Sequence, residues 1–178
     1  MLFIFSIVWG FANGHVAEQT AMGRMRFVAM DSRASFYLNS AGSFESEKEI
    51  HAELARMAAE TIFSRNPEGY DQPERLERLF NPETAKLLAA AETKDSETFR
   101  AQQIHQKLET GIIKELSVDN TTALVSVEGQ ILRAGVFNGK TVNDTKKVTV
   151  FLKLRVNDDM AFNGRYPLVV TEYQERFE

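Results

Sequence analysis

The chain has 178 residues, of which 43% are hydrophobic and 26% are charged, and its net charge is -4 at pH 7. This length and composition predict about one domain with a core of its own. The negative charge and the lack of a basic run argue against a nucleic-acid-binding protein, because phosphate contacts need clustered Lys and Arg. The sequence has no cysteine, which excludes disulfide bonds and thiolate chemistry.

The first seventeen residues contain no Lys, Arg, Asp or Glu, and the first charged side chain is Glu18. A membrane-spanning helix needs roughly 20 apolar residues, and this apolar run weakens at Asn13. A cleavable signal peptide would begin with basic residues, and none precedes the run. We expect residues 1–17 to be a membrane segment, either whole or truncated at its start. A cleaved signal peptide and a buried N-terminal element are the alternatives.

Residues 18–44 are predicted to be a linker with some strand character. The two β-prone runs, residues 25–30 and 35–38, lie on either side of Asp31-Ser32. Turn-forming residues 39–43 follow them. The linker should therefore lead into a folded domain that spans residues 45–178.

The sequence then predicts helices. Residues 46–64 carry apolar side chains at helical spacing, and Ser46 with Glu49 has the spacing of a capping box. A short helix follows Pro73, and Asn81 should cap a helical segment over residues 82–109 that Asp95-Ser96 breaks or kinks. The positions of this segment expected to face inward are Leu87, Leu88, Ala91, Phe99, Ile104 and Leu108.

After Gly111 the pattern changes to a period of two, which indicates strands at 112–118, 122–133, 146–156 and 168–177. Asn138-Gly139 predicts a tight hairpin between the second and third strands. The inward positions of these two strands are Ala123, Val125, Val127, Gly129 and Ile131, and Val148, Val150, Leu152, Leu154 and Val156. Helices followed by an antiparallel sheet with one wet face predict an α+β domain, with the helices on the concave face of a curved sheet.

The residues suited to chemistry do not form a recognisable site. His15, His51 and His105 are far apart in sequence, and a zinc site needs three or four converging ligands. Each histidine is therefore interpreted as a surface or packing residue, with His51 next to the core. Asp158-Asp159 is interpreted as a turn rather than a calcium site, and Gly129 as a bend in the sheet. We predict no catalytic, cofactor-binding or metal-binding residue and no cofactor.

Aromatic side chains cluster around the expected helix junctions. Core packing accounts for most of them, but an exposed subset would form a docking patch for another protein. The cluster consists of Phe36, Tyr37, Phe44, Phe63, Tyr70 and Phe80.

The order of these features resembles a known family. An apolar segment and a linker precede Phe36-Tyr37-Leu38 and a helix that reads from Ala55 to Phe63. Asn66-Pro67-Glu68-Gly69-Tyr70, a helical stretch centred on residues 76–82 and a strand with Val125-Ser126-Val127-Glu128-Gly129 follow. This pattern looks like the TraE family of conjugative type IV secretion proteins, which is similar to the wider VirB8-like group.

The resemblance implies a single-pass inner-membrane protein whose C-terminal domain lies in the periplasm and has the NTF2-like fold. It implies a non-enzymatic role in assembling the DNA-transfer channel and pilus. The expected partners are other type IV secretion channel subunits, a second copy of the chain, and the membrane through residues 1–17. Such a subunit should offer an exposed apolar groove or sheet edge, and it should have no buried acid–base pair.

An alternative function is an exported NTF2-like pocket protein, which carries a small ligand or acts as an isomerase or dehydratase. That chemistry needs a carboxylate or histidine with a raised pKa inside an apolar cavity. Alternation places Glu128 on the other face of its strand. A deep cavity that held Glu60, His105 or Glu172 would favour this alternative.

Overall fold

A computed structural model describes residues 27–30, 36–38 and 44–178 of the chain. The chain divides into two units, Met1–Ser43 and Phe44–Glu178. The expected membrane segment at residues 1–17 lies outside the described residues. In the described ranges, no helix is both long enough and apolar enough to cross a membrane.

The first unit contains a small antiparallel strand pair, β1 (Phe27–Met30) and β2 (Phe36–Leu38). Phe27 lies opposite Leu38, and the register shifts between Val28 and Met30. The two strands fall within the two β-prone runs of the linker.

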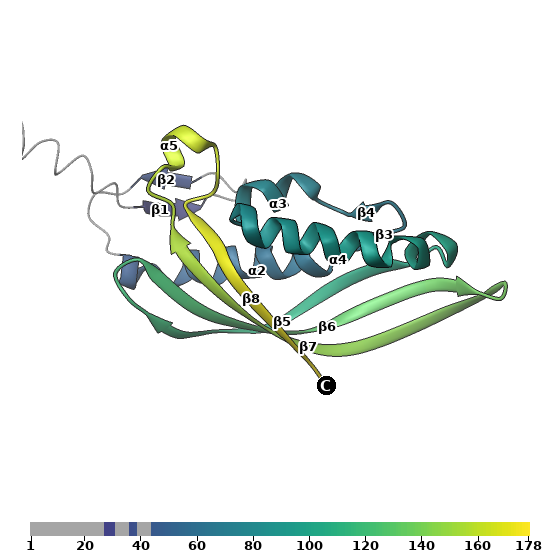
Figure 1. Cartoon of the computed structure of the whole chain (residues 1–178). Coiled ribbons are helices and arrows are strands. Elements are labelled where there is room, and N and C mark those ends of the chain that lie inside the picture. The colour runs from purple at the N-terminus through teal and green to yellow at the C-terminus, as the bar shows by residue number, and fades with distance from the viewer. Residues whose placement is uncertain (1–26, 31–35, 39–43) are drawn as a thin grey trace, which may run out of the picture. The chain divides into compact units, whose positions relative to one another are not determined.

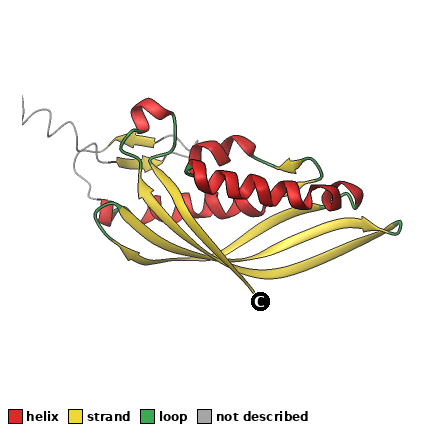
Figure 2. Ribbon diagram, in the orientation of Figure 1, coloured by secondary structure: helices red, strands yellow, loops and turns green. Residues whose placement is uncertain are grey.

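The second unit is an antiparallel sheet of six strands, in the order β4-β3-β5-β6-β7-β8, with helices on one face (Figure 1, Figure 2). The helical elements are η1 (Phe44–Ser46), α2 (Lys48–Phe63), α3 (Pro73–Leu79), α4 (Pro82–Ala101) and α5 (Met160–Asn163). The strands are β3 (Arg65–Asn66), β4 (Gly69–Tyr70), β5 (His105–Val118), β6 (Thr122–Phe137), β7 (Lys140–Val156) and β8 (Leu168–Phe177). This architecture confirms the predicted α+β class with helices on one face of a curved sheet.

Helix α2 buries its apolar stripe, which includes Leu54 and Met57, against the sheet. Its predicted capping box is wrong, because Ser46 belongs to the 3-10 turn η1 and the helix begins after it. Glu47 occupies the N-cap position without a side-chain cap bond, and its carbonyl accepts hydrogen bonds from the Ile50 and His51 amides. Because the 3-10 turn η1 includes Ser46, α2 begins only at Lys48.

Helix α4 begins as predicted, since Asn81 Oδ1 accepts a hydrogen bond from the Thr84 amide at 2.8 Å. The helix then runs without a break through Asp95-Ser96, so the predicted interruption is wrong. Leu87 is 65% exposed although it was expected to face inward. Leu88 is buried as expected, and Leu87, about 100° away around the helix, points to solvent.

Three strands are longer than the sequence indicates, and β5 differs most. It begins at His105, within the segment expected to be helical, because residues 105–110 pair with residues 129–134 of β6. Tertiary pairing here overrides local helix propensity. The predicted hairpin is confirmed: Asn138 and Gly139 have φ values of 50° and 72°, as a type I′ turn requires.

The predicted inward faces of β6 and β7 form the core. Val125, Leu152 and Leu154 are fully buried. Gly129 lies where a side chain cannot fit, because a Cβ there would be 2.6 Å from the Glu109 carbonyl oxygen. The register of β5 shifts nearby, between Thr110 and Ile113. Gly129 therefore marks a bend, as the sequence indicated.

Candidate functional site

A cleft formed by the described residues lies between the helices and the sheet. It has a volume of about 310 Å³. Helices α2 and α4 and strands β5 to β8 contribute to its lining. Apolar side chains from Ile62, Phe63, Leu88, Phe99 and Ile131 form part of the wall, and charged and phenolic groups form the rest.

Arg65 is the most constrained of the charged groups, since it is 7% exposed at the start of β3. Its guanidinium lies 4.1 Å from the ring centroid of Phe99 and 5.4 Å from that of Tyr70. Nη2 donates to the Glu92 carbonyl at 3.3 Å, and Nη1 lies 3.7 Å from Asp95 Oδ2. Nε has no hydrogen-bond partner among the described residues.

A second arginine approaches the cleft through a buried glutamine. Gln106 Nε2 donates to the Phe63 carbonyl at 2.9 Å, which fixes the amide orientation. Gln106 Oε1 then accepts from Arg133 Nε at 3.1 Å and from Nη2 at 2.6 Å. Residues 106 and 133 are cross-strand neighbours, so the β5–β6 register itself brings them together.

Burial changes the acidity of three groups around the cleft. Burial raises the pKa of Tyr70 to about 12, and its hydroxyl donates to the Leu88 carbonyl at 2.9 Å. Loss of hydration also raises the pKa of Tyr173, with a smaller contribution from Glu175. The pKa of Glu175 is raised by the same loss of hydration, and Lys146 opposes the shift. The cleft therefore favours neutral phenols and a more weakly acidic carboxyl.

A pair formed by a buried histidine and a half-buried carboxylate joins α2 to β5. His51 is 1% exposed, and its Nδ1 lies 2.6 Å from Glu115 Oε2. The ring also packs on Phe44, with centroids 4.4 Å apart, and Nε2 has no partner among the described residues. The expectation that no acid–base pair is buried is thus contradicted for the histidine of this pair, whereas its carboxylate is 18% exposed. The inward position of Glu115, opposite Val125, was the signal that sequence reasoning missed.

The residues named for the pocket-protein alternative are not brought together. His105 and Glu172 are exposed. Glu60 lines a separate cleft of about 210 Å³, where it pairs with Arg56 and lies 3.8 Å from Arg75. Lys107 also lines that cleft. Glu60 therefore lies in a polar, ion-paired setting rather than in an apolar one.

The predicted aromatic docking patch is not a surface feature where its side chains are described. Phe63 and Phe80 are buried, and Phe44 and Tyr70 are half-buried. The side chains of Phe36 and Tyr37 lie outside the described part of the chain. Large exposed apolar side chains come instead from α4, the strands and α5: Leu87, Ile112, Leu116, Leu132, Val136, Phe137, Val142, Phe162 and Phe177.

The acidic pair Asp158-Asp159 lies in a turn before α5. The Asp159 carbonyl accepts hydrogen bonds from the Phe162 amide at 2.9 Å and the Asn163 amide at 2.9 Å. Its backbone thus starts the short helix, in agreement with the turn interpretation. Among the described residues, no group of three or more His, Asp or Glu side chains gathers as a metal site would require.

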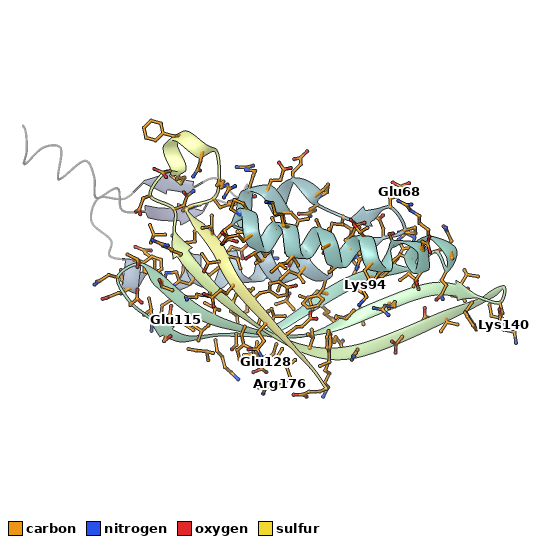
Figure 3. All side chains as sticks on the ribbon, in the orientation of Figure 1. Glu68, Lys94, Glu115, Glu128, Lys140 and Arg176 are labelled. Atoms are coloured by element: carbon orange, nitrogen blue, oxygen red, sulfur yellow. The ribbon has the colours of Figure 1, made fainter. Side chains whose placement is uncertain are left out.

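The β6–β7 ribbon offers a surface of a different kind. Its far end extends beyond α4, and Lys140 lies at the tip (Figure 1, Figure 3). Phe137 is 55% exposed and Val142 is 48% exposed there. These two residues border a groove of about 240 Å³ that also contains Ile104 and Gln102. An exposed apolar groove was among the features expected of an assembly subunit.

Several solved structures share this fold, whereas no family model and no curated protein matches the sequence. An IcmL-like type IV secretion system protein from Legionella pneumophila subsp. pneumophila str. Philadelphia 1 superposes with a TM-score of 0.58 at 16% identity, over 77% of this chain and 96% of that one. A periplasmic fragment of TraM superposes with a TM-score of 0.55 at 12% identity, over 75% of this chain and 99% of the fragment. The periplasmic domain of DotI superposes with a TM-score of 0.54 at 18% identity, over 76% of this chain and 99% of that domain.

The agreement covers nearly the whole of each solved domain and about three-quarters of this chain. At these identities the likeness concerns the fold. The curved antiparallel sheet with helices on one face is thus the arrangement that this chain shares with the IcmL-like protein, the TraM fragment and the periplasmic domain of DotI.

Proposed function

We propose that this chain is an assembly subunit of a conjugative type IV secretion system. Its domain at residues 45–178 lies in the periplasm and binds other channel subunits and a second copy of the chain. The observation that carries the proposal is the superposition with three such domains, over 96–99% of their lengths. TraE is the specific family proposed, because the order of motifs in this sequence resembles it.

Residues 1–17 anchor this subunit in the inner membrane as a single span. Their lack of charged side chains supports the anchor, because each charge is costly in a bilayer. The linker and the folded domain then lie on the periplasmic side. The membrane holds the domain beside the channel components that it helps to assemble.

Deletion of the gene tests this function directly. Transfer of the plasmid should be lost, and the full chain supplied in trans should restore it. A form in which a cleavable signal peptide replaces residues 1–17 is the matched control, and it should reach the periplasm without restoring full transfer. Membrane fractionation with crosslinking should retain the full chain with channel subunits. Undiminished transfer after deletion would contradict the proposal.

The pocket-protein alternative has one observation in its favour. The 310 Å³ cleft holds the unpartnered Nε of Arg65 and a carboxyl, that of Glu175, whose pKa is raised. A panel of small aromatic carboxylates tests it by thermal shift. A ligand that stabilises the wild type but not the Arg65→Met variant would support the alternative, whereas the assembly role predicts no ligand-dependent shift.

A further inference from the structure

The outer edge of β7 is unpaired over the half of the strand nearest the hairpin. Strand β6 pairs with β7 from Phe137 opposite Lys140 to Thr122 opposite Arg155. Strand β8 covers the other edge only from Val148, which lies opposite Phe177. The Glu178 amide donates to the Lys147 carbonyl at 3.2 Å and ends this pairing. Residues 140–146 therefore keep one free edge within the described part of the chain (Figure 1).

The orientation of the free backbone groups follows from two hydrogen bonds. The Val136 amide donates to the Gln102 carbonyl at 2.7 Å, away from β7. Its cross-strand neighbour Thr141 therefore points its own N–H and C=O away from β6, toward the free edge. Alternation gives the backbone groups of Asn143 and Thr145 the same orientation. The Lys147 carbonyl points to this edge too, since it accepts the hydrogen bond from the Glu178 amide.

This edge lacks most of the features that prevent strands from pairing. The β6–β7 register has no bulge, and residues 140–147 contain no proline. Such an edge is a template for a further strand. Lys140 and Lys146 are the charged residues that would repel a poorly matched strand, and Asp144 lies between them on the same face.

We propose that the β7 edge pairs antiparallel with the same edge of a second copy, with Val142 opposite Val142 across a two-fold axis. Lys140 of each copy then lies opposite Asp144 of the other. Thr141 lies opposite Asn143, and both residues have free backbone groups to exchange. The exposed Val142 side chains of the two copies meet on the face that carries the helices.

Charge selects this register over its neighbours. A shift of two residues toward the body of the domain places Lys140 opposite Lys146, and a further shift of two places Asp144 opposite itself. A shift toward the tip shortens the overlap and loses both Lys140–Asp144 pairs. Like charges opposite each other are destabilising in a sheet, whereas opposite charges and apolar pairs are favourable.

The pairing rests on the self-association that forms part of the proposed function, and it assigns a surface to it. A symmetric contact of this kind uses the same patch on both copies, so it closes as a dimer and leaves the convex face open to other proteins.

The chain has no cysteine, so Val142→Cys introduces a single thiol. Val142 directs its backbone groups toward β6, which makes the Val142 pair a non-hydrogen-bonded one with Cα atoms about 4.5 Å apart. That distance suits a disulfide, which needs about 4.4–6.8 Å. Mild oxidation of the full chain should give a covalent dimer on a non-reducing gel. Leu87→Cys, on the exposed face of α4, is the matched control and should remain monomeric.

Charge exchange tests the register. Lys140→Asp and Asp144→Lys, each combined with Val142→Cys, should lower the yield of covalent dimer, because each places like charges opposite each other. The triple variant with both exchanges should restore the yield. Circular dichroism should show that all variants stay folded, since these side chains are exposed.

Asn143→Pro gives a second test that leaves the side-chain charges unchanged. It removes an amide that points to the free edge, so the pairing with β6 should persist while the dimer dissociates in sedimentation equilibrium.

A wild-type chain that sediments as a monomer at all concentrations would overturn the inference. So would a dimer that Val142→Cys fails to crosslink, which would place self-association on another surface, or a charge exchange that fails to restore the yield. In each case, crosslinks from the chain to channel subunits would leave the assembly role standing.

Discussion

The two ends of the β6–β7 ribbon follow the same alternation but have different surroundings. At the end covered by helices, inward residues such as Val125, Val127 and Leu152 are at most 1% exposed. At the hairpin end, Phe137 and Val142 continue the inward face of the same strands and are about half exposed. Alternation therefore specifies which face a residue occupies, and the helices decide whether that face is buried. The uncovered end is therefore available to another molecule.

Truncation of an apolar side chain at each end gives the largest contrast. Leu152→Ala should lower the free energy of unfolding by about 2–5 kcal/mol, because it removes packed atoms from the core and leaves a cavity. Val142→Ala at the hairpin end should change it by less than about 0.5 kcal/mol. Urea denaturation of the monomer at pH 7 measures both values. Equal losses would show that the hairpin end is also packed.

Removal of one partner from an ion pair should lower stability more on the face of the sheet covered by helices than on the opposite, convex face. Glu115→Ala should cost about 1–3 kcal/mol, because it leaves the buried His51 Nδ1 without a partner. Glu128→Ala breaks a pair with Lys114 on the convex face, where both side chains are exposed, and should cost less than about 1 kcal/mol. Thermal and urea unfolding should agree on this order. The reverse order would mean that His51 finds another partner.

Loss of a helix cap tests how far the helices that cover the sheet depend on their own capping hydrogen bonds. Asn81→Ala removes the hydrogen bond to the Thr84 amide at the start of α4 and should cost about 1 kcal/mol. Glu47→Ala, at a position that makes no side-chain cap bond, should cost less than about 0.5 kcal/mol. Hydrogen exchange should rise in the first turn of α4 and leave the hairpin unchanged.

The smallest expected effect concerns Glu175, at the boundary between the two ends. Its pKa is raised in the folded state, so the folded protein holds a proton on this carboxyl more tightly than the unfolded chain does. The stability it contributes is full below the unfolded pKa and is lost as the pH rises through the folded pKa. Glu175→Gln should therefore be at least as stable as the wild type at pH 7 and lose that advantage near pH 4.

Local signals in the sequence predicted the features that depend on neighbouring residues. The bounds of β8, the Asn138-Gly139 turn and the Asn81 cap follow from patterns within a few residues, and the structure has all three. The start of β5 could not be found in this way, because residues 105–110 become a strand only through their pairing with β6. The extension of β7 toward the hairpin has the same origin.

The candidate site was less predictable, because its contacts join distant segments. His51 and Glu115 are 64 residues apart and meet only when α2 packs on β5. Arg65 reaches Phe99 and Glu92 only after α4 folds back along the sheet. Sequence patterns assigned faces to these residues but could not assign partners across elements.

The length of β7 has a mechanical consequence. Its 17 residues form one strand of about 56 Å, paired with β6 without a shift in register. The hairpin is thus the far end of the same continuous ribbon whose other end forms the core, with no loop between them. A force applied at the tip is therefore transmitted along hydrogen-bonded strands to the core. The length of the ribbon sets the distance between the core of this domain and a molecule bound at the tip.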